Sequence, residues 1–500
     1  MSTRKQPRRM PGLLVAAAMY TICATAITAY AQGGSVPSLP TWQLVERSAN
    51  SMPLGTVVIA DTPALKNAPR ENTIDLSRFG YVEEEYFISG TAKVYGSGAV
   101  AAGSAQSYVT RIIMRRPLDV YKFSGSVHME PFADDTEQAS TWTRAWSYFV
   151  EHGDVWIGVS VSKANIETMH KTYNAGRYGA LSVPDDTMRW GILAQVAWLM
   201  RSPEGPLADL HYHDQAAIIP GLLRVYLSGW AHTGCVVAEF INGGHHQNNR
   251  RPNGRPVIDG YLSGSCPQVT PLSVPADAAV MQIMSESEYE GSARAVTQAA
   301  RQPDGSIPLE RRYRWYDVAG SSRAGYQDQP RLSLVAFQMG RMDQVSLNCT
   351  NPVSESTSMN EVARVSLRNL DEWIRIGYHP PEGTAFELNE DGTIKRDGDG
   401  NAIGGFRSRR TEVPTSTFVP STDGSQNGAP ESLGGACTQF GHERPFSSEY
   451  VEKLHGDRRA YVEKTTDALI LLVNSRRMLE ADADADADAT LGQLRGADRR

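Results

Sequence analysis

The sequence predicts an α/β protein with a mostly parallel, doubly wound sheet, and three observations lead to this prediction. Predicted strands and helices alternate along the chain. Residues 278–284 form a short, continuous apolar run, as expected of a strand buried between two layers of helices. Residues 228–234, Ser-Gly-Trp-Ala-His-Thr-Gly, join a strand directly to a helix through a turn rich in small residues. With 500 residues, of which 41% are hydrophobic and 21% charged, the chain can bury one large core with insertions.

The N-terminal half is predicted to contain four strands and two helices. The strands are residues 86–95, 107–116, 124–129 and 154–161, and the helices are residues 141–151 and 188–201. The first two strands form an antiparallel pair, joined by the Gly/Ala/Ser-rich loop 96–105. The second helix carries Trp190, Leu193 and Met200 on one side, so we expect an amphipathic helix whose apolar side lies in the core.

The C-terminal half is predicted to hold the insertions. Asp397, Asp399 and Asn401 superficially resemble a calcium loop, but Ala402 and Ser408 replace the residues such a loop needs, so a hairpin turn is expected. Predicted elements further on are a flexible linker over residues 421–435, a final helix over residues 447–479, and a solvated, frayed Ala-Asp repeat over residues 481–489.

The N-terminus has the pattern of a secretory signal peptide. Basic residues between Arg4 and Arg9 precede an apolar run from Leu13 to Ala29, and Ala29-Tyr30-Ala31 forms a small-residue cleavage site. A transmembrane anchor is the less favoured interpretation, because the run is only marginally long enough and is rich in Ala and Thr. We therefore divide the chain into a signal peptide (1–31), a single domain (32–479) and a low-complexity acidic tail (480–500). The mature protein is expected to be secreted or periplasmic, without stable membrane insertion.

The turn at residues 228–234 has the requirements of a nucleophile elbow. Such a turn needs small residues around its central position, because a Cβ there would collide as the strand folds back into a helix. Gly229, Thr233 and Gly234 meet this need, and a serine at position 231 would complete Gly-x-Ser-x-x-Gly. The backbone N–H of His232 would then be one oxyanion donor. Alone, this pattern is also typical of an ordinary strand-to-helix turn.

Short segments along nearly the whole mature chain identify a family. The segments are Phe79-Gly80-Tyr81-Val82-Glu83-Glu84-Glu85-Tyr86-Phe87, Ser89-Gly90-Thr91-Ala92, Phe123-Ser124-Gly125, Asp259-Gly260-Tyr261-Leu262, Ser285-Glu286-Ser287-Glu288, Val318-Ala319-Gly320, Asp399-Gly400-Asn401-Ala402-Ile403-Gly404-Gly405 and Pro445-Phe446. Through them the chain resembles the bacterial alpha/beta hydrolase domain-containing proteins. The resemblance implies the α/β-hydrolase fold, an ester-hydrolase lineage and a Ser, acid, His triad.

Two of the triad positions that the resemblance implies are replaced. Ala231 stands at the nucleophile position of the elbow. The family's Ala-Gly-x-x-His-Ala segment here reads Ala319-Gly320-Ser321-Ser322-Arg323-Ala324, which puts Arg323 at the histidine position. Alanine has no hydroxyl, and arginine has no acceptor atom and keeps its proton at ordinary pH. The chain is therefore predicted to be catalytically inactive or strongly impaired.

The remaining site residues are also assigned from the resemblance. Glu286 and Glu288 follow the strand at residues 278–284, and either is a candidate for the acid of the triad. Arg323 is expected to pair with one of them in place of the imidazole. The second oxyanion donor is expected in the segment 130–137, where Pro131 has no N–H, so Phe132 or Ala133 would donate.

The number of cysteines and the net charge of the chain limit the cellular compartment and the binding partners that we expect. Cys235, Cys266, Cys349 and Cys437 remain after cleavage, and we predict the disulfides Cys235–Cys266 and Cys349–Cys437, with buried free thiols as the alternative. The formal charge is −7, and loss of four positive charges with the signal peptide leaves about −11, which makes nucleic acid an improbable partner. No cofactor is indicated, and no metal, because the adjacent His245 and His246 lack a third ligand at metal spacing.

Three functional classes remain open from the sequence. The chain is a non-catalytic homologue that binds an ester-like small molecule, a variant of a working carboxylic-ester hydrolase, or an active hydrolase that uses Ser228, Thr233 or His232. The third is the least favoured, because neither Ser228 nor Thr233 should point its oxygen where residue 231 points. The oligomeric state is unknown.

Overall fold

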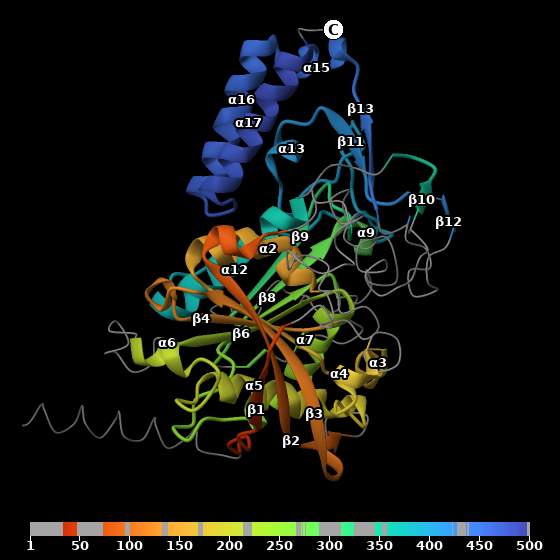
Figure 1. Cartoon of the computed structure of the whole chain (residues 1–500). Helices are drawn as coiled ribbons and strands as arrows, with labels where there is room; N and C mark the ends of the chain where they lie inside the picture. The colour runs from red at the N-terminus through yellow and green to blue at the C-terminus, as the bar shows by residue number, and fades with distance from the viewer. Residues whose placement is uncertain are drawn as a thin grey trace, which may run out of the picture.

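One nine-stranded sheet organises the part of the chain that the computed structural model describes (Figure 1). This part comprises residues 34–47, 74–95, 101–132, 139–168, 174–213, 223–266, 272, 274–275, 277–289, 312–324, 346–352, 358–422, 424–427, 437 and 440–497. The sheet contains β1 (Thr41–Val45), β2 (Tyr81–Tyr95), β3 (Ala101–Pro117), β4 (Ser126–Pro131), β5 (Val155–Val159), β6 (Arg224–Trp230), β7 (Gly260–Gly264), β8 (Ala279–Ser285) and β9 (Tyr313–Val318). The predicted signal peptide lies outside the described residues.

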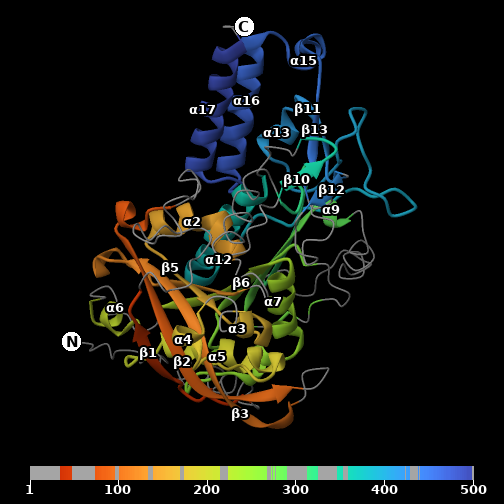
Figure 2. The ribbon, with the colours of Figure 1, turned by 45° about the vertical axis from the view of Figure 1, so that its right-hand side comes forward.

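The strand order is β1-β2-β3-β5-β4-β6-β7-β8-β9. β1, β2 and β3 are antiparallel to their neighbours, and the strands from β5 to β9 run parallel. The predicted mostly parallel α/β sheet with an early antiparallel pair is therefore confirmed. Residues 101–105, predicted as part of a loop, instead begin β3, where Ala105 pairs with Lys93. The long β2–β3 ribbon extends beyond the other strands in Figure 2.

Helices lie on both faces of the sheet. The α-helices are α2 (Ser140–His152), α3 (Lys163–Thr168), α4 (Ala175–Tyr178), α5 (Arg189–Met200), α6 (Ala208–His213), α7 (His232–Asn242), α8 (His245–Asn248), α9 (Glu286–Tyr289), α12 (Ser358–Ile376), α13 (Arg409–Glu412), α15 (Ser448–His455), α16 (Arg458–Asn474) and α17 (Glu480–Ala497). Short 3₁₀ segments are η4 (Leu76–Phe79), η5 (Val120–Lys122) and η7 (Asp186–Met188). Two small ribbons pair β10 (Ser346–Cys349) with β12 (Gly424–Asn427), and β11 (Ser416–Val419) with β13 (His442–Pro445).

The helices on the two faces of the sheet belong to two different hydrophobic clusters. α5 and α7 contribute to one cluster with the sheet, and α2 and α12 contribute to the other. On α2, Trp142, Ala145 and Phe149 have the spacing of one helix face, and Gly153 ends the helix at φ 76°. α5 differs from its prediction as an amphipathic helix, because most of its residues are buried, including Gln195, which donates to Thr91 and accepts from Tyr108. A helix enclosed on most sides does not need a polar face.

The C-terminal segment forms a helical hairpin that projects beyond the sheet (Figure 1). The predicted single helix over residues 447–479 is instead divided at Gly456, where φ is 86°. The Ala-Asp repeat, predicted to be frayed, lies within α17 and packs against α16. Its Asp482 and Asp486 lie one helical turn apart, pairing with Arg364 of α12 (Nη2–Oδ1, 2.6 Å) and Arg409 of α13 (Nε–Oδ2, 2.8 Å). These ion pairs explain why a low-complexity segment is ordered.

Two further predictions concern turns in the C-terminal half. The hairpin turn predicted at Asp397–Asn401 is confirmed, since the Asp397 carboxylate accepts from the backbone N–H groups of Asp399 and Asn401. The linker predicted over residues 421–435 is partly wrong, because residues 424–427 form β12. Residues 428–435 lie outside the described part of the chain.

Both predicted disulfides are present. Cys235 of α7 is bonded to Cys266, which follows β7, and Cys349 of β10 is bonded to Cys437. The first pair is close because β6 and β7 are adjacent parallel strands. Two disulfides are compatible with an oxidising, extracellular location. Among the described residues, no helix combines the length and apolar character needed to cross a membrane.

The two disulfides predict that protein produced in an oxidising compartment contains no alkylatable thiol among its four remaining cysteines. Non-reducing peptide mapping after alkylation in denaturant should recover the Cys235–Cys266 and Cys349–Cys437 peptides as linked pairs. Two or more alkylated cysteines in unreduced, unfolded protein would contradict this pairing.

Buried charges connect the antiparallel strands to the rest of the molecule. Glu85 on β2 is fully buried and pairs with Arg111 on β3, Arg177 of α4 (2.5 Å) and Arg47 (3.6 Å). The Tyr178 hydroxyl also donates to it, at 3.0 Å. Burial alone would raise the pKa of Glu85, but Arg111 and Arg47 outweigh burial and hold the pKa at about 2. Glu85 is therefore ionised throughout the ordinary pH range.

Candidate active site

Ala231 occupies a strained backbone conformation between β6 and α7. Its φ is 55° and its ψ is −123°, a combination that non-glycine residues rarely adopt. Such strain costs on the order of 1–3 kcal/mol and is concentrated at functional sites. The turn is also as tight as predicted, because a Cβ on Gly229 would lie 2.3 Å from the Thr233 carbonyl oxygen and one on Gly234 would lie 2.3 Å from that of Gly264. These distances exclude larger residues at both glycines.

The neighbouring hydroxyl groups are held in local hydrogen bonds. Thr233 Oγ1 accepts from the Trp230 N–H and donates to the Trp230 carbonyl oxygen, both at 2.9 Å. Ser228 is buried and donates to the Met129 carbonyl oxygen at 3.4 Å. Neither group replaces the hydroxyl that residue 231 lacks. The side chain of His232 is exposed at the first residue of α7.

A serine, a histidine and an aspartate do meet at the opposite ends of the strands. The Asp154 carboxylate accepts from Ser124 Oγ at 2.6 Å and lies 3.1 Å from His128 Nε2. The carboxylate therefore contacts both partners, whereas a triad places the histidine between the hydroxyl and the acid. His128 is fully buried and stacked on Tyr226 and Asp154 is also buried, whereas Ser124 is exposed at the edge of the core.

The structure separates the two candidate acids that spacing left equivalent. Glu286 is buried, accepts from the Gly320 N–H at 2.8 Å and pairs with Arg396 at 2.7 Å. Glu288 accepts from Ser285 Oγ at 2.7 Å through Oε2. Its other oxygen, Oε1, is buried, and no hydrogen-bond donor reaches it among the described residues. Glu286 Oε1 likewise accepts no hydrogen bond among the described residues, so the two glutamates differ in their ion pairs: Glu286 pairs closely with Arg396, and Glu288 Oε1 lies near Arg323.

The side chain of Arg323 lies next to Glu288. Arg323 Nε lies 3.8 Å from Glu288 Oε1, which confirms the expected ion pair with one of the two glutamates. The backbone N–H of Arg323 donates to Ser287 Oγ at 3.0 Å, so the loop is attached to α9. The Arg323 side chain is 36% exposed, which places the pair at the surface of the site. The side chain at position 323 is thus directed to Glu288, in the segment that follows β8.

Sequence analysis did not single out Arg144 of α2, which links the elbow to the loop of Arg323. Its guanidinium carbon lies 4.8 Å from the centre of the Trp230 ring, beside Ala231, and Nη2 donates to the Arg323 carbonyl oxygen at 2.8 Å. The Arg144 carbonyl in turn accepts from Arg364, which pairs with Asp482. Sequence spacing contained no signal for this contact, since Arg144 and Arg323 are 179 positions apart.

The structure bears differently on the three residues predicted as oxyanion donors, Phe132, Ala133 and His232. The Phe132 N–H donates to the Val159 carbonyl oxygen at 2.9 Å, so the expectation that Phe132 supplies a free donor is wrong. The cause is that β4 and β5 remain paired up to Pro131, the last residue of β4, and Phe132 continues this pairing. Ala133 lies outside the described residues. His232 is the first residue of α7, and its role as an oxyanion donor stays a prediction.

The fold, the elbow and the loops after β8 and β9 define the class of α/β hydrolases. A family profile described as alpha/beta hydrolase domain matches residues 42–487, so the chain belongs to this family. No curated protein matches the chain.

Three of the solved structures that match the chain share 9–11% sequence identity with it. A prolyl endopeptidase matches with 10% identity over 52% of this chain and 38% of its own, with a TM-score of 0.28, so the chain spans well under half of that protein. A poly(3-hydroxybutyrate) depolymerase from Bordetella parapertussis matches with 11% identity, 51% and 88% coverage and a TM-score of 0.27. An esterase from an Arctic intertidal metagenomic library matches with 9% identity, 47% and 84% coverage and a TM-score of 0.24.

Proposed function

We infer that this chain is a secreted α/β-hydrolase family protein that retains the scaffold for ester hydrolysis but lacks the groups that perform it. The strained conformation of Ala231 carries this inference. Alanine gains nothing from φ 55° and ψ −123°, whereas a nucleophile at that position is exposed above the end of the sheet. The strain is the expected remnant of a site built for a reactive side chain.

The acid of the inherited triad is Glu288. This assignment is supported by the position of its buried Oε1, 3.8 Å from Arg323 Nε, where an imidazole at position 323 would be oriented, whereas Glu286 pairs with Arg396. In the present chain the guanidinium of Arg323 neutralises this carboxylate instead. Arginine cannot accept a proton, so residue 323 cannot act as the general base for residue 231.

The ligand that the inherited site would bind is a small ester or a molecule of similar shape. The His232 N–H is the proposed donor to the ester carbonyl oxygen, with Ala133 as the remaining candidate for the second donor. Without an activated nucleophile, such a ligand would be bound and released unchanged. The signal-peptide pattern and the two disulfides support action outside the cytoplasm.

The first test is hydrolysis of an activated ester. We expect purified mature protein to hydrolyse p-nitrophenyl acetate no faster than the same protein after denaturation, because loss of the serine or the histidine of a triad lowers kcat by on the order of a millionfold. Turnover that survives purification and is blocked by a serine-directed phosphonate would contradict the proposed function.

A further inference from the structure

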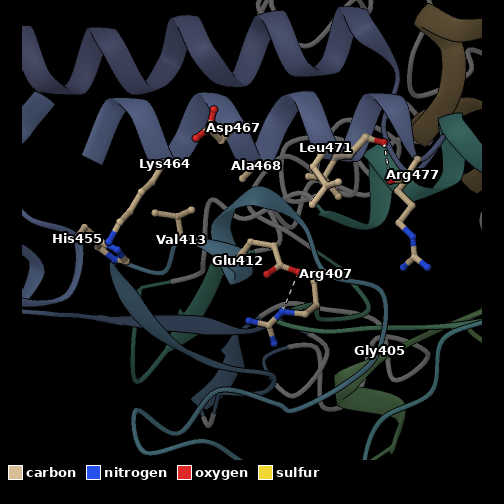
Figure 3. Close-up of a pocket in the computed structure, with 12 residues that line it drawn as sticks. Gly405, Arg407, Glu412, Val413, His455, Lys464, Asp467, Ala468, Leu471 and Arg477 are labelled. Carbon is tan, nitrogen blue, oxygen red and sulfur yellow. Dashed lines mark hydrogen bonds and ion pairs between the residues drawn. The ribbon is translucent and has the colours of Figure 1, made fainter. Parts of the chain in front are cut away.

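A cavity whose lining contains no candidate active-site residue lies between α16 and residues 405–413, a segment that includes α13 (Figure 3). Its volume is about 680 Å³, within the range of about 300–1,000 Å³ that is typical of small-molecule sites. Its lining residues include Gly405, Val413 and one face of α16. None of them is a candidate catalytic residue, so the cavity requires its own explanation.

The wall formed by α16 combines polar side chains, including Asp467, with an apolar stretch from Ala468 to Leu472, of which Leu471 is the most exposed. Lys464, Ala468, Leu471, Leu472 and Ser475 follow one another at helical spacing along this face. They span about 16 Å at the rise of an α-helix. Leu471 is 66% exposed although it lines a cavity, and Val413 lies on the facing segment in Figure 3. The cavity therefore exposes apolar side-chain surface, chiefly that of Leu471.

The cations of the cavity differ in how far their hydrogen bonds are already used. Arg407 is committed, because it pairs with Glu412 (Nε–Oε1, 3.2 Å) and donates to the carbonyl oxygens of Ala402 and Thr411. Lys464 donates to the Leu454 carbonyl oxygen at 3.1 Å. The Arg477 guanidinium makes no hydrogen bond or ion pair with any described residue, and its carbon lies 5.6 Å from the centre of the Phe406 ring.

Arg477 stands beyond the last turn of the apolar strip, at the opposite end from Lys464. Asp467, the lining carboxylate outside the Arg407–Glu412 pair, points away from Lys464 and Arg477 in Figure 3. A planar guanidinium with free donors matches a carboxylate in two parallel hydrogen bonds. An aliphatic chain attached to that carboxylate would cover Leu471 and Leu472.

We propose that this cavity binds an aliphatic carboxylate of medium chain length, with its head group on Arg477 and its chain along Leu472, Leu471 and Ala468. The face from Lys464 to Ser475, about 16 Å long at the helical rise, is about as long as dodecanoate. A carboxylate of this kind is also the acid product of ester hydrolysis, but the proposal does not depend on the state of position 231 or 323.

Dodecanoate binding to the mature protein tests the proposal by isothermal titration calorimetry. We expect saturable binding, weakened at least about tenfold by Arg477→Gln, because a charge-assisted hydrogen bond of about 1.5 kcal/mol or more is lost. Arg477→Lys should retain part of the affinity. Neutral dodecanol should bind the native protein and Arg477→Gln equally, since it has the same chain and no charge.

Arg459→Gln is the matched control. Arg459 lies near the start of α16, is 86% exposed and does not line the cavity, so its change should leave the affinity within about twofold. Absence of saturable binding by the native protein would overturn the proposal. So would undiminished binding by Arg477→Gln, because dodecanoate would then occupy another site. Both results are independent of the esterase test, which measures turnover.

Discussion

The double substitution Ala231→Ser with Arg323→His should create ester hydrolysis in this protein. We expect its kcat/KM for p-nitrophenyl acetate to exceed that of either single variant by at least ~10³-fold, because triad members act as a unit. A serine without a base remains a weak nucleophile, and a histidine without the serine has nothing to activate. The unusual backbone geometry needed by the nucleophile is already present at Ala231.

Glu288 gives this experiment an internal control. In the double variant, Glu288→Gln should lower kcat by about 10²–10⁴-fold, since a neutral amide no longer orients the imidazole and stabilises its charge. Glu286→Gln should leave kcat within about tenfold, because Glu286 holds Gly320 and Arg396 rather than residue 323. Circular dichroism should verify that each variant is folded.

Two outcomes would contradict this assignment of the site. Equal activity in Ala231→Ser alone would mean that another base serves position 231. A folded double variant that stays inactive on a broad panel of esters, and does not react with a serine-directed phosphonate, would mean that the triad positions are wrong.

Glu85→Gln should lower the free energy of unfolding by about 3–5 kcal/mol, as expected when one partner of a buried ion pair is removed. The change leaves Arg111 fully buried without its carboxylate and weakens the contacts of Arg177 and Tyr178. Urea denaturation with the disulfides intact, followed by far-ultraviolet circular dichroism, measures the loss. Glu387→Gln is the matched control, because Glu387 and Lys395 are both more than half exposed, and we expect less than about 1 kcal/mol.

The same glutamate predicts a pH dependence. The pKa of Glu85 is held at about 2 in the folded protein against an ordinary value of 4.5, so its contribution to stability is complete above pH 4.5 and is lost as the pH falls toward 2. The difference in stability between native protein and Glu85→Gln should shrink over this interval. A difference that stays constant from pH 5 to pH 2 would contradict the role assigned to the carboxylate.

Features that depend on local sequence could be predicted from the chain. The alternation of strands and helices, the elbow around Ala231 and the turn at Asp397 each follow from backbone requirements within a few residues. The disulfide Cys235–Cys266 could also be predicted, because the two cysteines follow neighbouring strands. The extent of α17 could not, since its order depends on Arg364 and Arg409, which are distant in sequence.

The sequence by itself determined the family, and it determined that position 231 has no hydroxyl and position 323 no acceptor atom, because these are properties of the residues themselves. Only the tertiary structure paired Glu288 with Arg323 and Glu286 with Arg396, engaged the Phe132 N–H with Val159, and brought Arg144 to the loop of Arg323. The physical reason is that hydrogen bonds and ion pairs depend on distances of about 3–4 Å between groups. Strand order and loop packing set these distances, and residue spacing does not encode them.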